Sequence, residues 1–122
     1  MRQRRRHTSL ANSFVNKKVD LTTTSVTTLY TVPDATNSII KSILVSEDSG
    51  NADTITVTIT DTSDNVFSLF KTKSISANGT TELLSAPLVL QQNEILKVTA
   101  ATANRLHVVL SALESKPREV IT

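Results

Sequence analysis

The alternation of apolar and polar residues is clearest over residues 54–60, which read Thr-Ile-Thr-Val-Thr-Ile-Thr. Successive side chains of a β-strand point to opposite faces, so Ile55, Val57 and Ile59 share one face and the threonines share the other. β-branched side chains are stiff in helices but fit a pleated surface well. The pattern therefore predicts a strand that has one face in a hydrophobic core.

Similar short apolar stretches recur along the chain, separated by turn residues. The pattern predicts strands within residues 19–32, 38–46, 54–60, 66–75, 82–90, 95–101 and 105–114. Asp61 begins a compact polar turn, and Asn78-Gly79 is typical of a type I′ β-hairpin. About eight strands without a helical segment predict an all-β protein, an antiparallel β-sandwich of jelly-roll type.

Two of these segments, residues 39–45 and 106–113, are apolar on both faces. A strand that is apolar on both faces should be covered on both, whereas the outer face of a two-layer sandwich meets only water. We therefore expect a homo-oligomer, with a trimer as the working hypothesis, that forms through one sheet. Uninterrupted alternation assigns five residues to this interface: Ile40, Leu44, His107, Val109 and Leu113.

The formal net charge of +2 combines a basic N-terminal segment with an acidic body. Residues 1–18 contain six bases and no acid, while residues 19–114 contain five bases and ten acids. The last eight residues contain two bases and one acid. We therefore predict a basic extended arm over residues 1–18, a β-sandwich over residues 19–114 and an extended tail over residues 115–122.

The arm has three interpretations. It is a solvated tail, or it contacts packaged nucleic acid through counterion release, or it lies along an acidic groove of a neighbouring subunit. The third hypothesis is favoured over nucleic acid because no aromatic stacking platform accompanies the bases. The residues expected to bind the partner are Arg2, Arg4, Arg5, Arg6, Phe14, Val15, Lys17 and Lys18.

The sequence favours neither catalysis nor a bound cofactor. It lacks cysteine and the nucleophile-elbow motif, and no apolar run approaches the ~20 residues of a membrane helix. His107 stands beside two valines, which favours a histidine on a sheet surface over a catalytic base. The acidic turns at residues 47–53 and 61–65 could ligate calcium, but turns recruit Asp and Asn for backbone reasons alone.

An ordered series of segments resembles small virion proteins of tailed, especially marine, bacteriophages. The segments are 28–33 (TLYTVP), 40–45 (IKSILV), 88–91 (LVLQ), 95–98 (ILKV) and 106–114 (LHVVLSALE). The resemblance implies a β-sandwich that decorates the head of the virion or sits on the tail. The favoured hypothesis is a cement protein, with the major capsid protein or another virion protein as partner. An adhesion module of the tail or fibre, which contacts the host through loops 47–53 and 61–65, is the alternative.

Overall fold

A computed structural model describes the backbone of residues 6–121 and the side chains of residues 11–117. This part of the chain contains nine strands and no helix. In chain order they are β1 (Arg6–Asp20), β2 (Thr27–Thr31), β3 (Asn37–Glu47), β4 (Asp53–Thr60), β5 (Val66–Ile75), β6 (Thr80–Glu82), β7 (Leu88–Leu90), β8 (Ile95–Ala100) and β9 (Leu106–Ile121).

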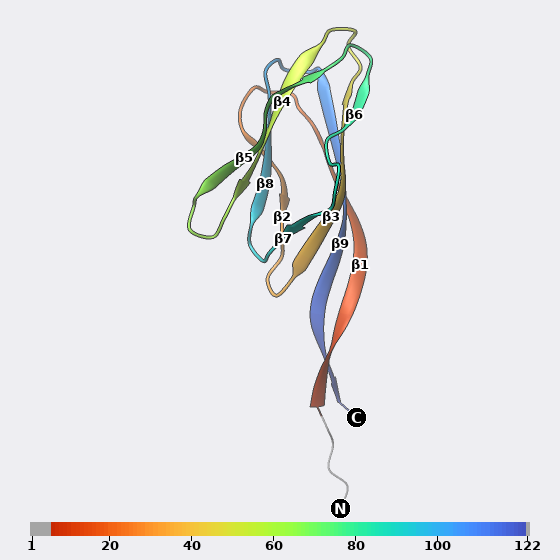
Figure 1. Cartoon of the computed structure of the whole chain (residues 1–122), viewed down its shortest axis with the longest axis vertical. Helices are drawn as coiled ribbons and strands as arrows, with labels where there is room; N and C mark the ends of the chain where they lie inside the picture. Colours follow the sequence, from red (N-terminus) through yellow and green to blue (C-terminus); the bar gives the residue numbers. More distant parts are fainter. Residues whose placement is uncertain (1–5, 122) are drawn as a thin grey trace, which may run out of the picture.

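The strands form two antiparallel sheets that pack face to face (Figure 1). The first sheet has the order β1-β9-β3-β6, with β7 also paired to β3, and the second has the order β2-β8-β4-β5. When β6 and β7 are counted as one interrupted strand, this is the order of a jelly roll. The predicted fold class is therefore confirmed, and the interruption accounts for the ninth strand.

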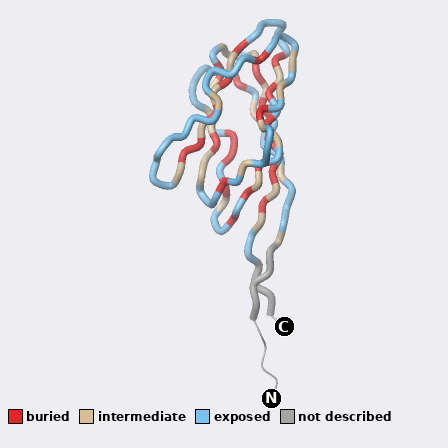
Figure 2. The backbone as a smooth tube through the Cα atoms, in the orientation of Figure 1, coloured by how far each residue is buried: buried red, intermediate tan, exposed pale blue. Residues whose placement is uncertain are grey.

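The core lies between the sheets and takes alternate residues from the central strands (Figure 2). Ile55 and Val57 of β4 have no exposed surface, and Ile59 retains 9% of its surface. Val108 and Leu110 of β9 face them from the first sheet and are fully buried. Burial of each such side chain stabilises the fold by roughly 1.5–3 kcal/mol. The predicted strand over residues 54–60, with one face in the core, is confirmed.

A β-bulge in β3 changes which side chains face the core. Ile40 and Ser42 are paired with consecutive residues of β9, so Lys41 between them is the extra residue of the bulge. The bulge turns Ile40 inward, on the same side as Ile43, and Ile40 is fully buried. Its assignment to the oligomer interface is therefore wrong, because that assignment assumed alternation without interruption.

The predicted N-terminal arm is largely a strand of the first sheet. β1 pairs with β9 along its whole length, from Arg6 opposite Ile121 to Asp20 opposite His107. The pairing of β9 with β3 begins only at Ser115, so beyond this residue β1 and β9 leave the body as a two-stranded ribbon (Figure 1). Residues 6–18 of the predicted extended arm are therefore part of the body's first sheet, because β9 of the same chain pairs with them.

The Asn78-Gly79 turn is not a β-hairpin. It joins β5 in the second sheet to β6 in the first, and the Gly79 N–H donates to the Ser76 carbonyl at 3.0 Å. Asn78 has a φ of 54°, while Gly79 is not in the positive-φ region that a type I′ turn requires. The hairpin prediction fails because the flanking strands belong to different sheets.

A buried polar cluster connects the two sheets at the end near the ribbon. Tyr30 of β2 donates its hydroxyl proton to Glu114 Oε2 of β9 over 2.5 Å, and its oxygen lies 3.0 Å from Ser38 Oγ of β3. Burial raises the pKa of Tyr30 to about 12, with a further contribution from the hydrogen bond to Glu114. The phenol therefore remains a donor, and the three buried polar groups satisfy one another.

The bulge predicts unequal effects for two neighbouring apolar residues of β3. Ile40→Ala removes a fully buried side chain and should lower the free energy of unfolding by about 2–5 kcal/mol. Leu44→Ala alters a side chain that is 39% exposed and should cost less than about 1 kcal/mol. Urea denaturation of both variants measures the difference, and equal losses would contradict the placement of the bulge.

Candidate assembly surface

A band of apolar side chains crosses the outer face of the first sheet. Strand register places Phe14 of β1 opposite Leu113 of β9, Leu113 opposite Ile39 of β3, and Ile39 opposite Val89 of β7. Phe14 is 82% exposed and Val89 is 60% exposed. We call these four residues the apolar band. Contiguous exposed apolar surface of this kind is typical of an interaction site.

Two further apolar residues extend the surface along β9 and β3. Val109 and Leu44 are paired with each other and both remain partly exposed, with His107 on the same face of β9. The face therefore contains four of the five residues assigned to it from the sequence: Leu44, His107, Val109 and Leu113. The sequence analysis did not assign Ile39 and Val89 to this face. Val89 alternates with two leucines, which is a local signal for an outward position, whereas Ile39 precedes the bulge, which reverses the face that regular alternation gives it.

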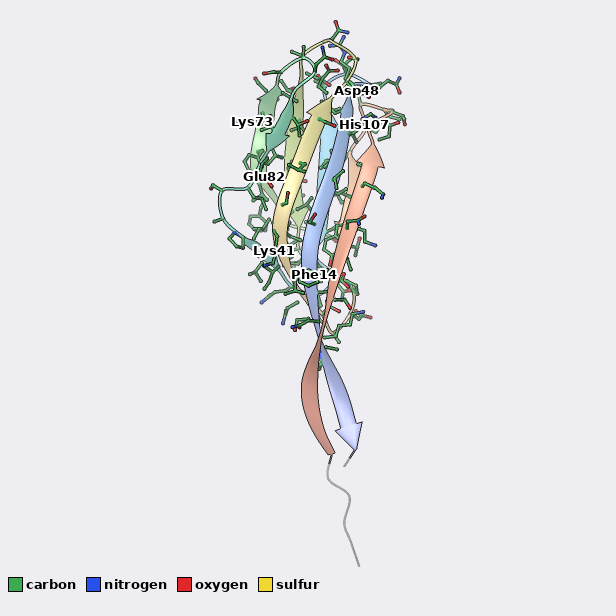
Figure 3. The ribbon with its side chains drawn as sticks, turned by 90° about the vertical axis from the view of Figure 1, so that its right-hand side faces the viewer. Phe14, Lys41, Asp48, Lys73, Glu82 and His107 are labelled. Carbon is green, nitrogen blue, oxygen red and sulfur yellow. The ribbon has the colours of Figure 1, made fainter. Side chains whose placement is uncertain are left out.

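A hollow of about 250 Å³ opens beside the apolar band. Phe14 and Lys41 rise on its two sides, and the small residues Ser111 and Ala112 of β9 lie between them. Figure 3 looks onto this face and shows both labelled side chains over β1, β9 and β3. The hollow can receive one side chain of a partner, and Lys41 adds a cation beside the exposed aromatic ring.

Glu82 of β6 stabilises the bulged part of β3. Its carboxylate accepts hydrogen bonds from the Ile43 N–H at 2.8 Å, from the Leu84 N–H at 3.3 Å and from the Ser42 hydroxyl. Burial alone would raise the pKa of Glu82, but these hydrogen bonds lower it below its ordinary value. The ionised side chain therefore supplies acceptors to β3 next to the bulge.

His107 lies between two carboxylates at the far end of the outer face from the ribbon (Figure 3). Its Nε2 atom is 3.2 Å from Asp20 Oδ1 of β1, and its Nδ1 atom is 3.6 Å from Asp48 Oδ2 in the loop after β3. All three side chains are more than 40% exposed. The three side chains form a polar rim at this end of the outer face. His107 lies on the sheet surface, as predicted from the sequence.

The two acidic loops use their leading carboxylates to hold their own backbones. Glu47 is 2% exposed and accepts hydrogen bonds from the N–H groups of Ser49, Gly50, Asn51 and Asn78. Asp61 accepts from the N–H groups two and four residues further along, both at 2.9 Å. The turn interpretation therefore accounts for both carboxylates without a calcium ion.

The residues of the predicted arm lie in different environments. Phe14 projects into solvent, whereas Val15 is half-buried and packs against the core. Lys17 and Lys18 are exposed. Arg6 begins β1, while Arg2, Arg4 and Arg5 lie outside the described residues. Phe14, the aromatic side chain of the predicted arm, therefore belongs to the apolar band.

The described residues contain neither a cluster of metal ligands nor a membrane-spanning helix. No group of three or more His, Asp or Glu side chains there is arranged to hold a metal ion. No helix in that range is long and apolar enough to cross a membrane. The outer face of the first sheet, which contains the apolar band, is therefore the candidate surface for binding a partner.

No known family profile and no curated protein matches the sequence. Among solved structures, a chain of the acid-stable capsid of Helicobacter pylori bacteriophage KHP30 is similar over 97% of this chain and 98% of that chain, with a TM-score of 0.52 and 14% identity. A chain from the disulfide-linked pili of Bacillus endospore appendages is similar over 92% and 89%, with a TM-score of 0.49 and 7% identity. The likeness to the capsid chain is one of fold.

The lowered pKa of Glu47 predicts that part of the free energy of unfolding depends on pH. Burial opposes its ionisation, but the hydrogen bonds from Ser49, Asn78 and Gly50 prevail and lower its pKa from 4.5 to about 2. A lowered pKa stabilises the folded state above pH 4.5, and this contribution disappears as the pH falls towards 2.

We therefore expect Glu47→Gln to lower the melting temperature at pH 7 by several degrees. The gap between the variant and the wild type should narrow steadily between pH 4.5 and pH 2, as followed by circular dichroism. Asp48→Asn, which changes an exposed neighbour, is the control. A gap that stays constant over this pH range would show that the carboxylate charge of Glu47 is not what holds the loop.

Proposed function

We propose that this chain is a structural protein of a bacteriophage virion, a decoration or cement protein that binds the surface of the particle. The observation that carries the proposal is its fold, which is similar over nearly its whole length to that of a chain of a phage capsid, together with the jelly-roll order of its own strands. Jelly rolls are common in viral capsid domains, although lectins and cupins also use them. The segments that resemble small virion proteins support the same role.

The outer face of the first sheet joins copies of the chain into a small oligomer in this proposal. The apolar band supplies buried area, and Phe14 fills the hollow beside Lys41 of the neighbouring copy. An aromatic ring beside an ammonium group gains a cation–π contact in addition to its burial. The rim around His107 and Glu82 is polar, as in most protein interfaces.

The basic N-terminal sequence attaches the oligomer to the major capsid protein or another virion protein. Arg2, Arg4, Arg5 and Arg6 precede or begin β1, which leads away from the body along the ribbon. An arginine guanidinium binds a carboxylate through two parallel hydrogen bonds, so an acidic groove of the capsid is a suitable partner. This division of tasks leaves the body for self-association and the arginines for attachment.

The test is the number of copies of this chain in purified particles, measured by quantitative mass spectrometry. Replacement of Arg2, Arg4 and Arg5 by Ser should leave folding and the oligomer unchanged while incorporation into particles falls at least about tenfold. Phe14→Ser should instead weaken the oligomer and change the free energy of unfolding by less than about 0.5 kcal/mol.

Lys71→Ser, which removes one exposed base of β5, is the control for the loss of a positive charge elsewhere on the chain and should be incorporated normally. Absence of the wild-type chain from particles would reject the virion role. Normal incorporation of the arginine variant would reject attachment through the basic sequence. If that variant entered particles but host attachment changed, the alternative role as a tail or fibre adhesion module would be favoured.

A further inference from the structure

The connection between β5 and β6 contains Asn78-Gly79, the only Asn-Gly pair of the sequence. This connection passes from the second sheet to the first at the end of the body opposite the ribbon (Figure 1). Asparagine followed by glycine is the pair most prone to deamidate, because the unhindered backbone nitrogen of the glycine can attack the side-chain carbonyl carbon of the asparagine. The connection therefore contains a pair of residues that can modify itself.

The turn requires these two residue types for steric reasons. Asn78 has a φ of 54°, in the left-handed region that asparagine adopts more readily than most residues. A Cβ atom added to Gly79 would lie 3.1 Å from the carbonyl oxygen of Ser76 and 3.3 Å from its Cβ atom, closer than side chains normally approach. Because a larger residue at either position would strain the turn, the fold retains the reactive pair.

Hydrogen bonds hold the backbone of the pair on both sides. The Gly79 N–H donates to the Ser76 carbonyl at 3.0 Å, and the Asn78 N–H donates to Glu47 Oε1 at 3.1 Å. The Gly79 carbonyl in turn accepts from the Glu47 N–H at 2.9 Å. Asn78 is exposed to solvent, whereas Glu47 is only 2% exposed. Backbone geometry, and not access of water, therefore limits any reaction of the Asn78 side chain.

Deamidation needs the Gly79 nitrogen as its nucleophile. This nitrogen loses its proton to a base in the solvent and forms a bond to Asn78 Cγ, and the side-chain nitrogen leaves as ammonia. One water molecule then opens the cyclic imide to aspartate or isoaspartate. In the folded protein the same N–H donates to Ser76, so this hydrogen bond must break before the nitrogen can attack.

We propose that Asn78 is a deamidation site that the Glu47 carboxylate keeps unreactive until the connection opens locally. This carboxylate accepts hydrogen bonds from the N–H groups of Ser49, Gly50 and Asn51 as well as from Asn78, so it joins the loop after β3 to the connection. Loss of the carboxylate frees one side of the turn and allows Gly79 to leave Ser76. The site involves neither the apolar band nor the arginines, so the proposal is independent of the virion role.

The modification changes the structure that delayed it. Isoaspartate adds one carbon atom to the main chain between positions 78 and 79, which displaces the Gly79 N–H from Ser76 and the Gly79 carbonyl from Glu47. The new carboxylate also lies in the same turn as the N–H that Glu47 binds, where a second negative charge is unfavourable. Because ammonia has left, closure of the turn does not restore the amide, and the connection between the two sheets stays loosened.

The rate of deamidation at Asn78 tests the proposal in the full chain. The protein is incubated at mildly alkaline pH, and peptide mapping by mass spectrometry follows the mass gain of the acid over the amide. We expect the folded wild type to react at least about tenfold more slowly than the wild type in urea. In native buffer, Glu47→Gln should react about tenfold faster than the wild type, because its amide cannot replace both carboxylate oxygens as acceptors.

Asp61→Asn is the matched control, since it makes the same exchange of carboxylate for amide in the other acidic turn. Asn78 should react at the wild-type rate in this variant, and circular dichroism at the incubation temperature establishes that each variant is folded. Equal rates in the folded and the unfolded wild type would overturn the proposal. An unchanged rate in folded Glu47→Gln would overturn the role of the carboxylate.

Amide hydrogen exchange of the wild type provides a second test that does not depend on the folding of a variant. The N–H groups of Asn78 and Gly79 should both be protected, because each donates to an acceptor within the protein. Exchange of the Gly79 N–H at the rate of an unstructured chain would show that the nitrogen is already free to attack. That result would reject the proposed protection even if Glu47→Gln did not fold.

Discussion

The pairing of β3 with β9 is the constraint on which the rest of the structure depends. Its register places Ile43 beside Leu110 in the core and Leu44 beside Val109 on the outer face. Because the side-chain period of a strand is two, a slip of one residue would exchange the core with the surface. The same strand pairing therefore determines which side chains form the interior and which form the exposed outer face.

Residues whose role depends on local alternation could be predicted from the sequence. Residues 54–60 and the outward positions of β9 are examples, since nothing interrupts the period of two there. Ile40 could not be assigned correctly, because the bulge at Lys41 shifts the period and depends on Glu82, which is 39 to 41 residues away in sequence. Hydrogen bonds from a side chain on a distant strand cannot be recognised in the local alternation of apolar and polar residues.

The fate of the basic segment shows a different limit of prediction from sequence. A charged stretch with few apolar residues is typical of a disordered chain, yet residues 6–20 pair with residues 107–121. The pairing provides main-chain hydrogen bonds along β9, and Val15 and Val19 pack against the core, which the charged composition of the segment does not show. Phe14 consequently changes role, from an anchor of an arm to the most exposed member of the apolar band.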